Sequence, residues 1–175
     1  MDNKKSRICL ITSAVLVLGT VICALSFRIG PTLLSNSEGE VVYTDISAHV
    51  IVITALFALA TVFLFLYLKF KNDALSSKEN LIIALLFLIA GFLFSIASGC
   101  LVQSARWSSY YTRMLTEPAW YAGSITSKKF FGQLPLYAKR FRTYGIVFVF
   151  LSIIMCVVTA CIYSKYSKNM EKKKN

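Results

Sequence analysis

The chain has 175 residues, of which 57% are hydrophobic and only 15% charged, and its mean hydropathy is +0.65. Soluble domains are about one quarter charged, and disordered chains are poor in aromatic residues, whereas this chain has 13 Phe and 9 Tyr. The composition therefore excludes both classes and indicates an integral membrane protein. The net charge of +11 raises the question of where the cations lie.

Four apolar runs are each long enough to cross a bilayer core of about 30 Å, which takes roughly 20 helical residues. None of them contains Lys, Arg, Asp or Glu, and they are apolar all round, as helices facing lipid are. The sequence predicts an all-α integral membrane protein, a four-transmembrane-helix bundle with a larger second extracytoplasmic loop. The predicted spans are 8–27, 48–68, 81–102 and 145–163, with loops 28–47 and 103–143 on one side and a basic tail 164–175.

The first span follows Lys4, Lys5 and Arg7. A charged start, an apolar run and a small-residue site also describe a cleaved secretory signal, but an apolar core of about 20 residues is longer than signals have, which favours a retained helix. Three cations before this helix and an acidic loop after it predict that both termini are cytosolic. Eleven basic residues then flank the spans on the cytosolic side and eight on the other.

The loop 28–47 has turn residues between two short runs of strand formers, which suits a β-hairpin, although an irregular connector fits equally well. Asp45 is placed to cap the second helix. His49 follows at the outer end of that helix, where a lone histidine is more often incidental than functional.

The third span carries Gly91, Ser95 and Gly99 at intervals of four residues. Small residues at this spacing form a stripe that lets another helix approach closely, and Ser95 could hydrogen-bond across the contact. We predict packing within the bundle, with a second copy or a partner helix as the alternative.

The loop 103–143 holds seven basic residues and one acid, Glu117, and therefore more than half of the net charge. Nine aromatic residues are interleaved with these cations, a pattern that suits lipid headgroups, an acidic protein or a glycan. A belt that merely seats the bundle is the alternative. The third helix is predicted to run on until Glu117-Pro118, and Pro135 to break the chain again. The candidate ligand-binding residues are Arg106, Trp107, Lys128, Lys129, Lys139, Arg140, Phe141 and Arg142.

Two features lie near the cytosolic ends of the spans. Cys9 and Cys161 are candidates for lipidation, although small apolar packing is the commoner role of membrane cysteines. Lys172 and Lys173 occupy the positions of a di-lysine retrieval signal, and a polybasic tail that touches anionic lipid explains them equally well.

The sequence lacks the groups of residues that enzymatic catalysis usually requires. There is a single His, the carboxylates are scattered in loops, and no metal-ligand or redox cysteine spacing occurs, so we expect no catalytic residues, no metal and no cofactor. Lys, Arg, Asp and Glu inside the spans, which mark ion and proton pathways, are also absent from the sequence.

The first span reads Arg7-Ile8-Cys9-Leu10-Ile11 through Val17-Leu18-Gly19-Thr20-Val21. With four spans, cytosolic termini and modest size, the chain resembles the broad claudin and MARVEL group of tetraspan membrane proteins at the level of architecture. The resemblance implies a left-handed four-helix bundle with a role in cell contact, membrane organisation, trafficking or assembly of other membrane proteins.

The leading hypothesis is therefore a non-enzymatic tetraspan adaptor or organiser. Its expected partners are other membrane proteins or further copies of itself, membrane lipids, and an acidic protein or glycan on the outside, but not nucleic acid. Two alternatives are a channel-forming or channel-accessory subunit and an endoplasmic reticulum trafficking factor. The expected location is the plasma membrane or the endoplasmic reticulum and secretory pathway.

Overall fold

The fold consists of four long helices and one short hairpin, seen here in a computed structural model that describes residues 2–29, 33–35, 41–43, 46–71, 77–116 and 127–174. The elements in chain order are α1 (Asp2–Ile29), β1 (Leu33–Ser35), β2 (Val41–Tyr43), α2 (Ile46–Lys71), α3 (Ser77–Thr116) and α4 (Ser127–Lys174). All four helices are long and apolar enough to cross a membrane, which confirms that part of the predicted fold class.

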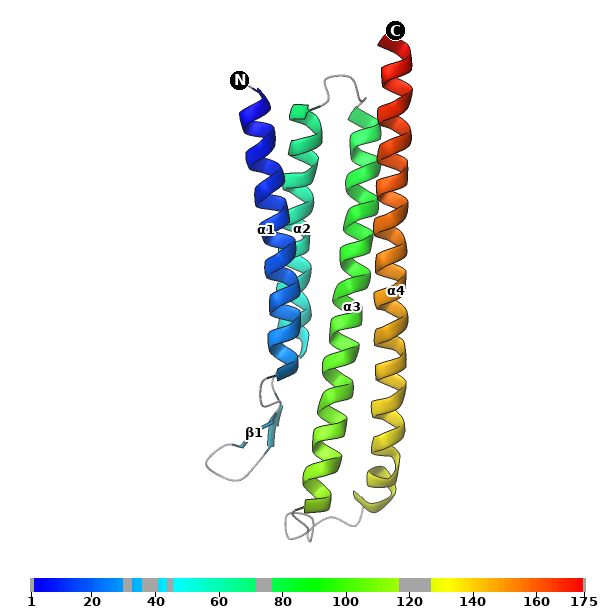
Figure 1. The fold of residues 1–175 in the computed structure, drawn as a ribbon. Coiled ribbons are helices and arrows are strands. Elements are labelled where there is room, and N and C mark those ends of the chain that lie inside the picture. The colour runs from blue at the N-terminus through cyan, green and yellow to red at the C-terminus, as the bar shows by residue number, and fades with distance from the viewer. Residues whose placement is uncertain are drawn as a thin grey trace.

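The helices lie side by side, and both chain termini are at the same end of the bundle (Figure 1). We call this the terminal end and the opposite one the distal end. The main contacts follow chain order, α1 with α2, α2 with α3 and α3 with α4, while α1 touches α3 only lightly. At the distal end α3 and α4 project well beyond α1 and α2.

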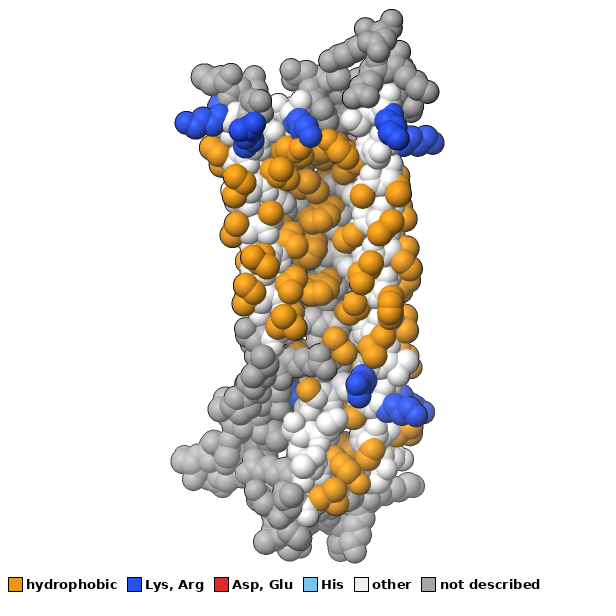
Figure 2. Space-filling view, viewed as in Figure 1, with side chains coloured by type: hydrophobic (Ala, Val, Ile, Leu, Met, Phe, Trp, Pro, Cys, Tyr) orange, Lys and Arg blue, Asp and Glu red, His pale blue; other side chains and the backbone are white. Residues whose placement is uncertain are grey.

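On the face that Figure 2 shows, apolar side chains form a broad band between Lys and Arg side chains at the terminal end and a second group of cations toward the distal end, and further apolar side chains lie beyond that group. Large residues on all four helices are more than half exposed, for example Ile11 at 63%, Ile51 at 65% and Phe150 at 62%. A water-soluble protein does not expose a continuous apolar surface of this kind. The bundle therefore has the surface of a protein whose solvent is lipid.

Hydroxyl groups connect neighbouring helices inside the bundle. Ser13 Oγ of α1 donates to the Ala60 carbonyl of α2 at 2.9 Å, and Ser152 Oγ of α4 donates to the Ala90 carbonyl of α3 at 2.8 Å. Ser104 Oγ of α3 donates to the Ala138 carbonyl of α4 at 2.7 Å. Because a hydroxyl in an apolar interior is costly unless it is bonded, these bonds also fix which helix faces must meet.

The stripe of small residues on α3 faces α2. A Cβ added to Gly91 would overlap the Phe57 ring, and one added to Gly99 would lie 2.9 Å from Val50 Cγ2. Ser95 is completely buried, but it donates to the Gly91 carbonyl of its own helix at 3.0 Å. The predicted hydrogen bond across the contact is therefore wrong, and the role of Ser95 here is to be small.

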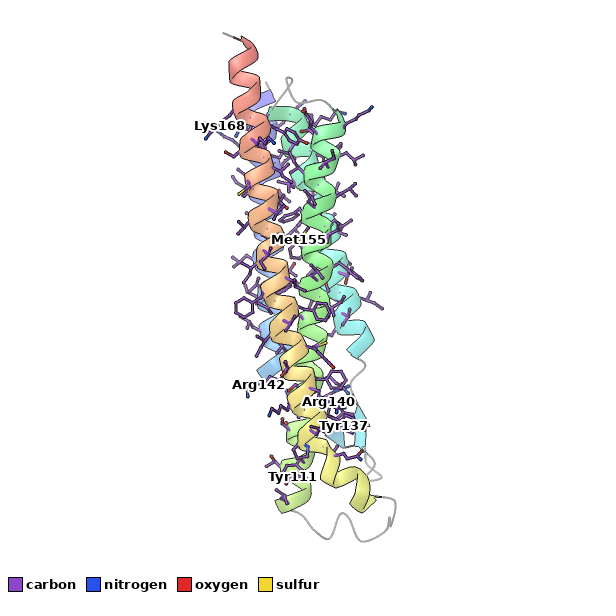
Figure 3. The ribbon with its side chains drawn as sticks, turned by 90° about the vertical axis from the view of Figure 1, so that its right-hand side faces the viewer. Tyr111, Tyr137, Arg140, Arg142, Met155 and Lys168 are labelled. Atoms are coloured by element: carbon purple, nitrogen blue, oxygen red, sulfur yellow. The ribbon has the colours of Figure 1, made fainter. Side chains whose placement is uncertain are left out.

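The helices run further than the apolar spans. Most of the predicted loop 103–143 is helical, because α3 continues to Thr116 and α4 already starts at Ser127. The predicted break at Pro135 is wrong, since this residue lies inside α4. Proline removes one backbone hydrogen bond and bends a helix without having to end it, and the first turns of α4 diverge from the axis of the rest (Figure 3).

The connection between α1 and α2 contains two paired strands, which favours the predicted β-hairpin over an irregular connector. Strands β1 and β2 pair antiparallel, with Leu33 opposite Tyr43 and Ser35 opposite Val41. Asp45, the predicted helix cap, lies outside the described residues.

Candidate binding site at the distal end

The side chains that the structure describes offer mainly cations, hydroxyl groups and apolar surface for a site. Among the described residues no three His, Cys, Asp or Glu side chains come together as a metal site would require. Glu79, at the start of α3 at the terminal end, is the one carboxylate among the side chains that the structure describes. A candidate site must therefore be sought in pockets and cationic surfaces.

Three of the predicted ligand-binding residues, Lys139, Arg140 and Arg142, are exposed on the distal part of α4 (Figure 3). We call these three residues the distal basic surface. Among the described side chains no carboxylate lies near these three cations.

The other predicted binding residues fall in different places. Arg106 of α3 is only 8% exposed, because the helix continues through this position and packs it inside, and its role in binding stays a prediction. Trp107 is half-buried beside Tyr137 of α4, with ring centroids 6.4 Å apart, and Phe141 is half-buried. Lys128 and Lys129 belong to the first turn of α4, and their side chains lie outside the described ones.

A cavity of about 300 Å³ opens between α3 and α4 beside the distal basic surface. Its polar lining consists of hydroxyl groups from α3 and two cations from α4: Ser104, Ser108, Tyr111, Thr112, Lys139 and Arg142. We call this cavity the distal pocket.

Helical spacing explains how this lining forms. Residues three, four, seven and eight apart share one face of a helix, which groups Ser104, Ser108, Tyr111 and Thr112 on α3. The same rule groups Lys139 and Arg142 on α4, and the hydrogen bond from Ser104 to the Ala138 carbonyl holds the two faces together. The sequence contains this spacing, but it predicted a loop here and so missed the pocket.

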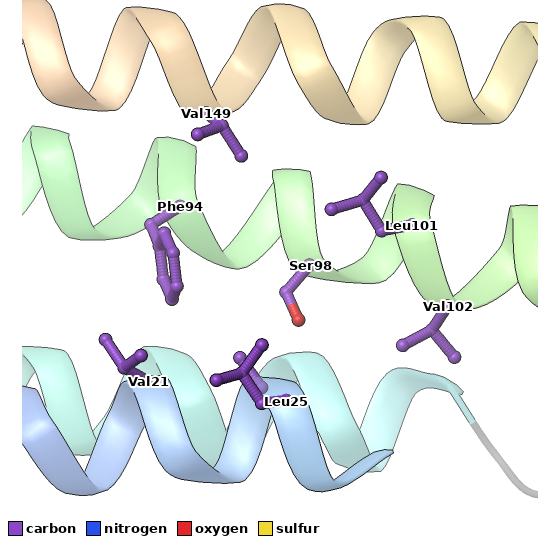
Figure 4. A pocket seen from close by; sticks show the side chains of 8 residues that line it. Val21, Leu25, Phe94, Ser98, Leu101, Val102 and Val149 are labelled. Atoms are coloured by element: carbon purple, nitrogen blue, oxygen red, sulfur yellow. The ribbon is translucent and has the colours of Figure 1, made fainter. Parts of the chain in front are cut away.

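A second cavity, of about 190 Å³, lies among α1, α3 and α4 in the apolar part of the bundle (Figure 4). Its walls are Val21, Ala24 and Leu25 of α1, Phe94, Leu101 and Val102 of α3, and Val149 of α4, with Ser98 of α3 as its polar member. We call it the helix groove. It exists because α1 packs mainly on α2 and leaves space beside α4.

Ser98 also contacts a polar side chain of α2. His49 Nε2 lies 2.8 Å from Ser98 Oγ, and His49 is only 1% exposed. The expectation of an incidental interfacial histidine missed this buried contact. The signal in the sequence was a serine on the third span, which needs a polar neighbour in an apolar bundle.

The remaining candidates lie toward the terminal end. Cys9 is 8% exposed and packs inside the bundle, whereas Cys161 is exposed on α4. The helix α4 continues through Lys172 and Lys173, whose side chains are not among those described.

Comparison of the chain with protein-family models, with curated proteins and with solved structures finds no match. The resemblance to the claudin and MARVEL group stays a prediction. A function must be argued from the bundle and its distal end.

Proposed function

We propose that this protein is a multi-pass membrane adaptor, without enzymatic activity, whose distal basic surface binds an acidic segment of a partner membrane protein. The observation that carries the proposal is the cluster of Lys139, Arg140 and Arg142, exposed with no described carboxylate nearby, on a helix pair that projects past the rest of the bundle. Complementary charges steer and orient partners at protein interfaces, so exposed cations on a projecting helix pair suit an acidic partner.

Helical rise supports placement across a membrane. At 1.5 Å per residue, His49 lies about 30 Å along α2 from Lys69, and Arg142 lies about 35 Å along α4 from Lys165. These spacings match a hydrocarbon core of about 30 Å, with Lys69 and Lys165 just outside one boundary and Arg142 just outside the other. With the terminal end at one surface, the distal basic surface stands at the other. The positive-inside rule then favours cytosolic termini.

The distal surface also has the composition of an interface. Trp107 and Tyr137 pack together beside the cations, and aromatic residues with Arg are the types that contribute most at protein contacts. The cations would steer an acidic partner, and the aromatic residues would supply the contact area.

Co-purification tests the proposal. The triple variant Lys139→Glu, Arg140→Glu, Arg142→Glu should lose at least about tenfold of any bound membrane partner, because charge reversal adds repulsion to the lost attraction. The matched control is Lys165→Glu with Lys168→Glu, which reverses exposed cations of the same helix at the terminal end. Retention of every partner by the triple variant would count against an adaptor that works through this surface, as would equal loss from the control.

A further inference from the structure

The distal pocket and the helix groove are aligned along the same two helices. On α4, Lys139 and Arg142 line the pocket and Val149 lines the groove. The intervals from Lys139 to Arg142, Ile146 and Val149 are three, four and three residues, so all four lie on one face. On α3, Ser108 of the pocket and Leu101 of the groove are seven residues apart and also share a face. The polar cavity and the apolar one therefore lie on the same faces of α3 and α4.

The distal pocket and the helix groove lie at different depths in the proposed membrane placement, and these depths match the headgroup and the acyl chains of a lipid molecule. Measured along α4 from Lys165, Val149 lies about 24 Å away, within the hydrocarbon core, while Arg142 and Lys139 lie about 35 and 39 Å away. The headgroup region extends the bilayer to about 40–45 Å in all. In the membrane placement proposed above, the pocket is at the headgroup level of the leaflet on the distal side, and the groove is among the acyl chains of that leaflet.

The pocket offers donors for an anion. The Lys139 ammonium and the Arg142 guanidinium are charged donors, and the Ser108 hydroxyl is exposed beside them. Arginine and lysine bind phosphate oxygens through charge-assisted hydrogen bonds. Between the two cavities the face of α4 shows Ile146, which is 44% exposed and would contact the start of an acyl chain.

We propose that the distal pocket binds the phosphate of an anionic phospholipid while one of its acyl chains occupies the helix groove. This inference rests on the proposed membrane placement and shares Lys139 and Arg142 with the proposed partner surface, but it does not require that a protein partner binds. The occupant is a lipid and not a free phosphate ion, because an apolar groove lies on the same helix faces as the pocket, at the depth where acyl chains lie.

Native mass spectrometry of the purified full-length protein, equilibrated with dioleoyl phosphatidylglycerol or dioleoyl phosphatidylcholine, tests the proposal. The wild-type chain should retain phosphatidylglycerol in preference to phosphatidylcholine. The double variant Lys139→Gln, Arg142→Gln should lose about fivefold in retention per cation removed, the usual effect of one basic residue near an anionic lipid. Arg140→Gln is the matched control, since about 200° of helical rotation separates it from Arg142 and it does not line the pocket.

A second pair of variants tests the groove and keeps the proposal falsifiable if the double variant does not fold. Ala24→Phe fills the groove and should lower phosphatidylglycerol retention, whereas Ala14→Phe, on the exposed side of the same helix, should not. Equal retention of both lipids by the wild-type chain, or equal loss from Arg140→Gln, would overturn the proposal. Inorganic phosphate in large excess that displaced the lipid fully, with no effect from Ala24→Phe, would also overturn it in favour of a free ion.

The two proposals fail in different ways. Loss of a protein partner from Arg140→Glu with lipid retention unchanged would support the adaptor alone. Loss of lipid from Ala24→Phe with the partner still bound would support the lipid site alone.

Discussion

At the scale of single residues, the bundle depends on positions where only a small side chain fits. Gly91 faces the Phe57 ring, which also packs against Phe87 at 5.2 Å and Phe94 at 6.3 Å between ring centroids. The spacing of Gly91, Ser95 and Gly99 at intervals of four residues predicts a close helix contact, but the identity of the aromatic neighbour depends on the register of α2 against α3. Spacing along one helix contains no information about that register.

Gly91→Ala should lower the free energy of unfolding by about 1–3 kcal/mol, the usual cost of overpacking. Gly19→Ala is the matched control, because a Cβ there meets nothing within 4 Å; it should be neutral or stabilising by up to about 1 kcal/mol through helix propensity. Unfolding of the purified variants in mixed micelles gives both values. Equal effects of the two substitutions would show that Gly91 does not hold α2 and α3 together.

The pair His49 and Ser98 is the corresponding polar contact at this scale. A double-mutant cycle of His49→Leu and Ser98→Ala should give a coupling of about 0.6 kcal/mol and no more than about 1.7, the range measured for hydrogen bonds between membrane helices. A coupling indistinguishable from zero would mean that the 2.8 Å contact adds nothing to stability.

At the scale of helices, the sequence predicted where apolar runs lie but not where helices end. Hydropathy reports the solvent that a side chain prefers, whereas a helix satisfies its own backbone and can continue into water. That is why α3 and α4 extend through much of 103–143 and why Pro135 bends α4 without ending it. All residues that line the distal pocket lie in these helical extensions. The sequence predicted Lys139 and Arg142 as binding residues, but it predicted a loop there and so did not predict the cavity between the two helices.

The contribution to stability of hydroxyl hydrogen bonds between helices can be measured separately from that of hydroxyl hydrogen bonds within one helix. Ser152→Ala removes the bond from α4 to the Ala90 carbonyl of α3 and should cost about 0.6 kcal/mol. Ser95→Ala removes a bond to its own helix and should be neutral or slightly stabilising, because alanine is the better helix former. Both serines are buried, so a comparison of the two unfolding free energies isolates the contribution of the contact between α3 and α4.

At the scale of the whole molecule, the structure shows where part of the net charge of +11 lies. Part of it lies at the terminal end, where Lys71 Nζ donates to the Tyr163 hydroxyl at 3.3 Å and so links α2 to α4. Another part lies on the distal basic surface, beyond the apolar band. Cations at both ends weaken any orientation argument that rests on total counts, because that rule works by the difference between the two sides. The orientation prediction therefore rests mainly on Lys4, Lys5 and Arg7 in the first two turns of α1.

The orientation can be measured directly. Asn-x-Ser acceptor sites placed in the connection 117–126, at the N-terminus and after Asn175 should be glycosylated only in the connection if the termini are cytosolic, because glycan transfer takes place on the lumenal side. An increase in mass that glycosidase removes reports each site. Glycosylation at the termini with none in the connection would show that the protein has the opposite orientation in the membrane. The distal pocket would then face the cytosolic leaflet, where anionic lipid is concentrated, so the lipid site would survive this outcome while an extracellular partner would not.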